Sequence, residues 1–287
     1  ALVDLDAAVA SDLNNAEAWS WRAAIHMVQA NYAQARRSCE MLAPLTTPLI
    51  ATACTAQVDA TTGRTAEAAR SLRQALQDTA LKSAGASDGQ AAQRLWVLTR
   101  LAETEERRGA YKEADTAFRE ALALQIDDVY LQAAYADFLL DQGRAAEVPS
   151  LLKGRGRADV LLLRQALAAR ALKAPEAAAL SRELGARFDA ARLRGDTTHR
   201  KEESRYVRSV LGESSASAAA NALRLATENF AEQREPADAR ILLEAALTAK
   251  NPAAADPVLQ WMAKSGIDSV VLKRLAAQLV SQPGAKQ

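Results

Sequence analysis

The sequence contains two cysteines, Cys39 and Cys54, whose spacing would allow a disulfide. Cys39 lies seven residues before Thr46 and Cys54 seven residues after Thr47, so both would stand at the same level of an antiparallel helical hairpin that turns at these threonines. In an oxidising compartment, a disulfide closing such a short loop contributes on the order of 3 kcal/mol to stability. The alternative is that both cysteines stay reduced and pack as small buried apolar residues.

The two histidines of the sequence, His26 and His199, are too few and too widely separated to suggest a zinc site with the cysteines. His199 is followed by Glu202, Glu203 and Tyr206, and a histidine among carboxylates can perform acid–base chemistry. However, the same run, THRKEESRY, is typical of a solvated helix start, with threonine near the cap and acidic residues in the first turns. An enzyme centred on His199 is therefore the least favoured interpretation, and we expect neither a metal nor a cofactor.

Other catalytic signatures are absent from the sequence. It contains no serine nucleophile motif, no phosphate-cradling glycine loop and no dinucleotide fingerprint. The run RGR at 155–157 could contact phosphate, but it lies at a break between helical stretches and is more simply a linker. We predict that the protein is not an enzyme.

The charge balance disfavours two classes of partner. Lys and Arg total 36 against 35 acidic residues, and a net charge of +1 gives no field that would recruit nucleic acid or an anionic membrane. No apolar run approaches the roughly 18 residues that a membrane-spanning helix needs. The first residues do not resemble a signal peptide, but the sequence starts within a repeat, so a targeting segment could have been removed.

The elements that would position these residues are helices, because apolar residues recur at helical spacing and no window alternates as a strand would. The clearest unit covers residues 95–128. Within it Ala114, Phe118 and Ala121 fall at i, i+4 and i+7, so small residues on one face admit a paired helix while the ring fills the gap. Gly109 lies in the turn between the two helices, where a left-handed backbone is often required.

This unit recurs along the chain. Gly143 lies 34 residues after Gly109, whereas the interval from Gly63 to Gly109 includes an insertion over 77–90 that we expect to be an exposed loop or a frayed helix end. In these features the sequence resembles the tetratricopeptide repeat family, of an uncharacterised bacterial type. The resemblance implies an all-α solenoid of stacked antiparallel helix pairs that wind into a right-handed superhelix.

We expect three parts in the chain. Residues 1–15 would hold the second helix of a truncated repeat. Residues 16–153 would form the repeat array, with repeats starting near 16, 49, 95 and 129. Residues 154–287 would form divergent helical hairpins, built from seven further helices, of which the last caps the array.

In the tetratricopeptide family the first helix of each repeat lines a concave groove, so the resemblance also implies a binding surface. The candidate residues on it are Gln57, Trp96, Thr99, Glu103, Glu106, Tyr130 and Asp137. They include neither the lysine nor the asparagine with which chaperone-binding members clamp a terminal carboxylate. Aromatic anchors beside acidic residues suit a partner segment with apolar side chains and basic flanks. Alternatively, Trp96 and Tyr130 pack against adjacent helices and the acidic residues are merely solvated.

The predicted function is a non-enzymatic scaffold that binds a protein or peptide segment in this groove. A helical-repeat protein that reads RNA is the alternative, but the acidic groove and the net charge of +1 argue against it. A possible disulfide and a start within a repeat favour the bacterial periplasm or envelope over the cytoplasm. The sequence identifies neither the partner nor the oligomeric state.

Overall fold

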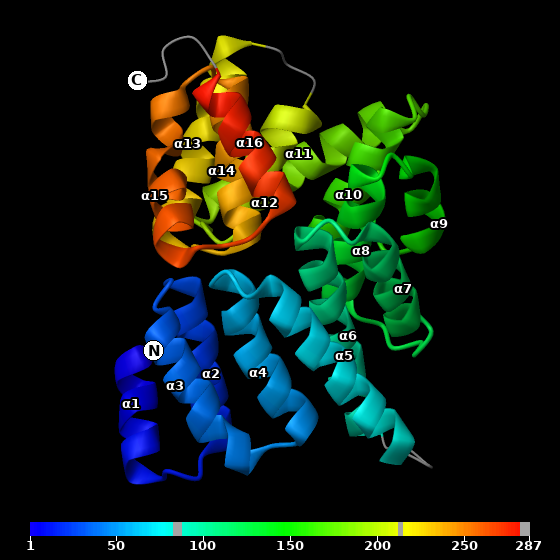
Figure 1. Ribbon diagram of the computed structural model, residues 1–287. Coiled ribbons are helices and arrows are strands. Elements are labelled where there is room, and N and C mark those ends of the chain that lie inside the picture. Colours follow the sequence, from blue (N-terminus) through cyan, green and yellow to red (C-terminus); the bar gives the residue numbers. More distant parts are fainter. Residues whose placement is uncertain (83–87, 212–214, 282–287) are drawn as a thin grey trace. The chain divides into compact units, whose positions relative to one another are not determined.

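The computed structural model describes residues 1–82, 88–211 and 215–281 (Figure 1). Every regular element in this part of the chain is helical, in sixteen α-helices and three short 3-10 helices, which confirms the all-α prediction. None of the described helices has both the length and the apolar character needed to cross a bilayer.

The chain divides into two compact units. Unit 1 comprises Ala1–Ile126, Glu232–Pro236 and Leu259–Arg274. Unit 2 comprises Asp127–Ala231, Ala237–Val258 and Leu275–Gln287. The boundary after Ile126 thus falls inside the repeat array expected over 16–153. The segment Leu259–Arg274, late in the sequence, belongs to the same unit as the N-terminus.

Unit 1 contains seven consecutive helices. They are α1 (Leu2–Ser11), α2 (Ala16–Val28), α3 (Tyr32–Leu42), α4 (Pro48–Thr61), α5 (Thr65–Lys82), α6 (Asp88–Arg107) and α7 (Tyr111–Leu122). Each packs against the next along the chain, and α4 also packs against α6 (Figure 1). Fully buried alanines such as Ala35, Ala60 and Ala114 lie in these seams, where the small side chain lets neighbouring helices approach closely.

Within unit 1, the two helices of a pair are joined by a recurring turn. Gly109 adopts a left-handed conformation with φ +80°, and the N–H of Ala110 then donates to the carbonyl of Glu105 at 2.9 Å. This bond caps a carbonyl that the helix end would otherwise leave unpaired, as the sequence predicted for a glycine here. Ala30 has φ 60° in the corresponding turn of the first pair, so the same geometry forms there without glycine.

The insertion over 77–90, expected to be an exposed loop or a frayed helix end, is helical at both ends, because α5 continues to Lys82 and α6 begins at Asp88. Its middle, residues 83–87, lies outside the described residues.

The segment Leu259–Arg274 joins unit 1 through contacts with the turn between α4 and α5. Thr65 donates its hydroxyl to the carbonyl of Asp268 at 3.3 Å. A Cβ added at Gly63 would lie 2.8 Å from the carbonyl oxygen of Gly266, so this glycine is required by close backbone approach as well as by its φ of +85°.

Unit 2 begins with α8 (Val129–Asp141), η2 (Ala145–Glu147) and α9 (Val148–Leu151). It continues with α10 (Asp159–Ala171), α11 (Ala177–Leu193), α12 (Arg200–Ser209), α13 (Ala216–Glu232) and α14 (Pro236–Thr248), and then η3 (Pro252–Ala255). The division between the units runs through α15 (Asp256–Ser265) and α16 (Val270–Val280). Helices α10 to α16 match the seven predicted after residue 154. Alternate helices contact each other, α8 with α10 and α10 with α12.

One helix of unit 2 is much shorter than the repeat pattern predicts. After Gly143 a full second helix was expected, but the chain forms only a 3-10 turn and the four residues of α9. Pro149 separates the 3-10 turn from α9, because proline has no N–H to donate to the carbonyl of Ala145, and soon after the end of α9 the chain turns through Gly154, whose φ is +76°. Val148 and Leu152 are nevertheless fully buried.

Candidate binding surfaces

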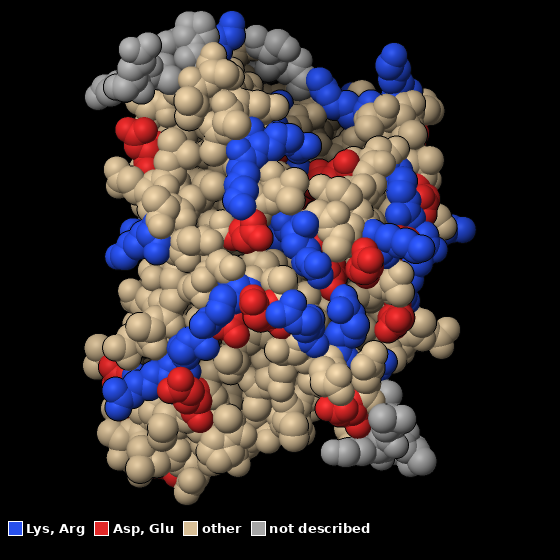
Figure 2. Space-filling view, viewed as in Figure 1, with Lys and Arg blue, Asp and Glu red and all other residues tan. Residues whose placement is uncertain are grey.

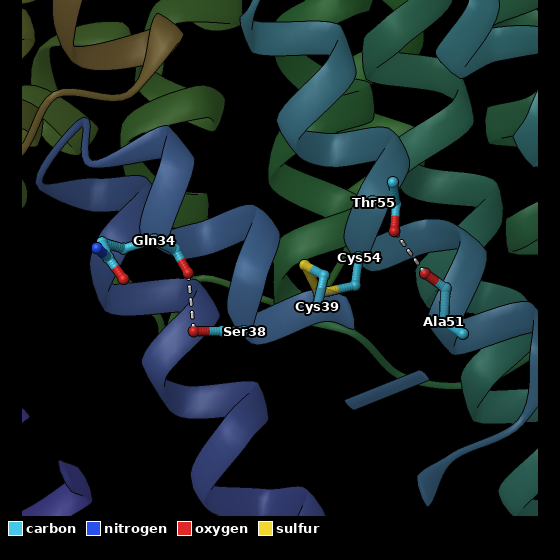
Figure 3. Close-up of a disulfide and its surroundings, with 6 residues drawn as sticks. All are labelled: Gln34, Ser38, Cys39, Ala51, Cys54 and Thr55. Atoms are coloured by element: carbon cyan, nitrogen blue, oxygen red, sulfur yellow. Dashed lines mark hydrogen bonds between the residues drawn. A yellow bond between two sulfur atoms is a disulfide. The ribbon is translucent and has the colours of Figure 1, made fainter. Parts of the chain in front are cut away.

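The two cysteines form a disulfide in unit 1 (Figure 3). Cys39 on α3 and Cys54 on α4 have Cα atoms 5.5 Å apart, and Cys39 is 1% exposed. The bond joins the second helix of one pair to the first helix of the next. The disulfide therefore joins the two cysteines that the hairpin spacing predicted to lie at the same level. It also limits how far two neighbouring helix pairs can separate.

Five of the predicted binding residues lie in unit 1, on α4 and α6, which pack together. Gln57 on α4 and Trp96, Glu103 and Glu106 on α6 are partly exposed. Thr99 differs, because it is 1% exposed and donates its hydroxyl to a backbone carbonyl of its own helix at 2.9 Å. Thr99 is thus not available to a partner. In unit 1 the accessible part of the predicted surface is Gln57 together with Trp96, Glu103 and Glu106, which we call the α6 stripe.

Side chains on α6 hold one another in place. The Arg100 guanidinium carbon lies 5.8 Å from the centre of the Trp96 ring, within the range of a cation–π contact. Arg100 also donates to the Glu103 carboxylate at 2.9 Å. The stripe is therefore less acidic than the sequence suggested, because an arginine one turn away pairs with Glu103. It presents an aromatic ring flanked by both signs of charge.

An exposed tryptophan on α2 was missed by the sequence analysis. Trp21 is 57% exposed, and its indole N–H donates to the Glu17 carboxylate at 3.4 Å. Trp19 instead is 8% exposed and donates to the carbonyl of Leu13 at 2.9 Å. The spacing of the two tryptophans could have shown this. Two residues along a helix correspond to about 200° of rotation, so Trp19 and Trp21 cannot both face the core.

The remaining two predicted residues, Tyr130 and Asp137, lie on α8 in unit 2. Tyr130 is 48% exposed. Asp137 accepts hydrogen bonds from Arg164 Nη2 at 2.6 Å and from Arg205 Nη1 at 2.6 Å. Burial alone would raise the pKa of Asp137, but the two guanidiniums outweigh it and hold the pKa well below its usual range. Asp137 is therefore already paired within the unit, contrary to the expectation of an acid that awaits a basic partner.

The pairing continues across unit 2. Arg240 donates from Nε to Glu244 at 2.8 Å and from Nη2 to Asp141 at 2.7 Å, and Arg208 also donates to Glu244. Burial would raise the pKa of Glu244, but Arg240 and Arg208 outweigh it and lower that pKa. The Asp137 and Glu244 groups are linked through Arg205, whose charge also lowers the pKa of Glu244, and we call the two groups together the arginine–carboxylate network. Its members are Asp137, Asp141, Arg164, Arg205, Arg208, Arg240 and Glu244, on α8, α10, α12 and α14. Figure 2 likewise shows blue and red side chains interspersed on the face in view.

The cluster considered for acid–base chemistry does not assemble around His199. His199 Nε2 lies 4.0 Å from a carboxylate oxygen of Asp196, which is not one of the acids in that cluster. Glu203 is buried and accepts from Arg192 at 2.6 Å, whereas Tyr206 donates its hydroxyl to a backbone carbonyl of α11 at 3.1 Å. These side chains thus have separate partners within unit 2, and no common substrate position follows from them.

Two other features are accounted for by local contacts. The RGR run is tied into unit 2, since Arg155 pairs with Asp127 and the carbonyl of Arg157 accepts from Arg187 at 3.1 Å. Among the residues described, no group of three or more His, Cys, Asp or Glu side chains is placed to hold a metal ion.

A shallow pocket of about 340 Å³ lies in unit 1 between α3 and α4, where Tyr32, Val58 and Thr62 line it beside two arginines. Both of these, Arg36 and Arg64, pair with the same carboxylate, that of Asp59. The charges at this pocket are therefore largely satisfied within the protein.

No protein-family model matches the chain, and no curated protein is significantly similar to it. The resemblance to tetratricopeptide repeats therefore depends on the residues and turns described above.

Proposed function

We propose that the chain is a tetratricopeptide-type solenoid that binds a segment of another protein and performs no chemistry on it. Three features support this proposal: helices that pack as consecutive pairs, contacts between alternate helices, and a left-handed turn that recurs between paired helices. Stacked pairs of this kind present extended surfaces, and such surfaces commonly bind extended segments.

The observation that carries the proposal is the position of Trp96. Its ring is partly exposed on α6 and lies against Arg100, so the side chain is ordered before any partner arrives. An aromatic ring held in this way loses little conformational entropy on binding, which is a property of interface hot spots. The partner segment would cover the ring with an apolar side chain and place polar groups near Arg100 and Glu103. Trp21, on the first helix of an earlier pair, offers a second aromatic contact.

Selection from a random peptide library displayed on phage tests this function without knowledge of the natural partner. Immobilised full-length protein should enrich peptides that share an apolar anchor and compete with one another for one site. Failure to enrich any peptide, over repeated selections with folded protein, would argue against a groove that binds segments.

The disulfide favours an oxidising compartment such as the bacterial periplasm. The RNA-binding alternative gains no support from a net charge of +1. A gel shift that weakens with salt would be needed to revive it.

A further inference from the structure

Part of the C-terminal region belongs to unit 1. This segment, Leu259–Arg274, comprises most of α15, the connection to α16 and the start of α16, and we call it the strap. Unit 1 contains three complete helix pairs, α2–α3, α4–α5 and α6–α7. The turn within each pair has a left-handed residue, Ala30, Gly63 or Gly109, which lies two positions after the end of the first helix. The three turns are therefore equivalent positions of successive pairs.

The strap contacts the first two of these turns. At the α2–α3 turn, the indole N–H of Trp261 donates to the hydroxyl of Tyr32, the first residue of α3, at 2.7 Å. At the α4–α5 turn, a Cβ added at Gly63 would lie 2.8 Å from the carbonyl oxygen of Gly266. A separation this short leaves no room for a side chain, so the two backbones are in direct contact.

The strap also contacts the third turn. A Cβ added at Gly109 would lie 3.3 Å from Cγ2 of Val270, at the start of α16. Trp261, Gly266 and Val270 thus meet the first, second and third turn, so the strap and the helix pairs follow the same order along the chain. The strap therefore bridges α2–α3 and α6–α7, which are not neighbours in the sequence.

The spacing of the helix pairs is the property that these contacts affect. Stacked pairs contact only their neighbours, so such an array changes its curvature through small shifts at each interface. A segment that contacts three successive pairs opposes these shifts, because moving one pair breaks its contact with the strap. The α6 stripe spans two of the pairs, since Gln57 lies on α4 and the other members lie on α6. Both helices end at turns that the strap contacts, α4 at Thr61 and α6 at Arg107.

We propose that the strap is a brace that holds the three helix pairs at one spacing and thereby keeps the α4 and α6 parts of the α6 stripe arranged for a partner segment. The consequence for binding rests on the proposed function, whereas the brace itself does not. A surface whose parts are fixed before binding loses less conformational freedom when the partner arrives, so the brace raises the affinity of the stripe.

Hydrogen exchange of the full chain, measured by mass spectrometry, tests the brace by comparing Gly63→Ala with Gly143→Ala. Gly63→Ala places a methyl group against the Gly266 carbonyl and should displace the strap, so exchange should accelerate by about fivefold or more at all three turns. Gly143→Ala imposes similar left-handed strain, with φ +71°, but its Cβ would meet no other described part of the chain within 4 Å. It should leave the three turns as they are in the wild type. Acceleration confined to the α4–α5 turn in Gly63→Ala would overturn the proposal, because strain at residue 63 alone produces it.

Trp261→Phe provides a second variant that leaves the glycine turns intact, and it decides the matter if circular dichroism shows that Gly63→Ala does not fold. It removes the donor to Tyr32 at one end of the strap. Exchange should accelerate at the second and third turns as well as at the first. Acceleration at the α2–α3 turn alone would overturn the brace.

The affinity of a library-selected peptide measures the effect on the α6 stripe. Gly63→Ala should weaken binding by about fivefold, and Gly143→Ala should bind as the wild type does. Unchanged affinity in a Gly63→Ala protein with three loosened turns would overturn the link between the strap and the stripe. Failure of the wild type to bind any peptide would instead contradict the proposed function, and the exchange comparison would still decide whether the strap is a brace.

Discussion

The indole N–H of Trp261 donates a 2.7 Å hydrogen bond to the hydroxyl of Tyr32, although 229 residues separate them in the sequence. Trp261 is 7% exposed, and both residues belong to unit 1. The segment Leu259–Arg274 is therefore part of unit 1. In a linear array each repeat would contact only its sequence neighbours.

Trp261→Phe should destabilise unit 1, because it removes the donor while keeping most of the ring. We expect a loss of about 1 kcal/mol in the free energy of unfolding, typical of one buried neutral hydrogen bond. Urea denaturation followed by circular dichroism measures it. Trp21→Phe, at an exposed indole, is the control and should change stability little. Equal effects from the two variants would contradict the contact.

Tyr32 should titrate later than an ordinary tyrosine. Burial raises the pKa of Tyr32 to about 12, against a smaller opposing effect of the Trp261 hydrogen bond. Because the folded-state pKa is raised, the associated stability is fully present below the unfolded pKa of about 10 and is lost as the pH rises towards 12. Ultraviolet absorbance against pH should show a late ionisation step whose amplitude falls by one tyrosine in Tyr32→Phe. An unchanged curve would refute this assignment.

Asp137→Asn should cost about 3 kcal/mol of stability, because it leaves Arg164 and Arg205 buried beside a neutral amide. Asp189→Asn removes an exposed carboxylate that pairs with Arg192 in the same unit, and it should cost less than about 1 kcal/mol. Denaturant unfolding of both variants gives the comparison. Similar losses would show that the network contributes no more than a surface pair.

Reduction of the Cys39–Cys54 disulfide should lower the midpoint of thermal unfolding, with a loss of about 3 kcal/mol for a loop of this length. Cys39→Ala with Cys54→Ala should behave as the reduced protein does and should not respond to reductant. Alkylation of the unreduced wild type, followed by intact mass, should add no alkyl group. Two additions would rule out the bond.

The sequence was sufficient for features that depend on local spacing. The turn at Gly109 and the buried register of Phe118 follow from backbone and packing rules within one helix pair. The failures involve residues whose environment is set by distant parts of the chain. Thr99 looked accessible and is buried, and Asp137 looked free and is paired with arginines 27 and 68 residues away. The helical period places such residues on a face, but it cannot show which side chain of a later helix meets them.

The central proposal, segment binding on α6, is tested most directly by the affinity of a library-selected peptide for three forms of the protein. Trp96→Ala should weaken binding by about thirtyfold, corresponding to about 2 kcal/mol for a hot-spot residue. Met41→Ala, which truncates an exposed apolar side chain on the second helix of a pair, should bind as the wild type does. Wild-type affinity in a fully helical Trp96→Ala protein would contradict the account.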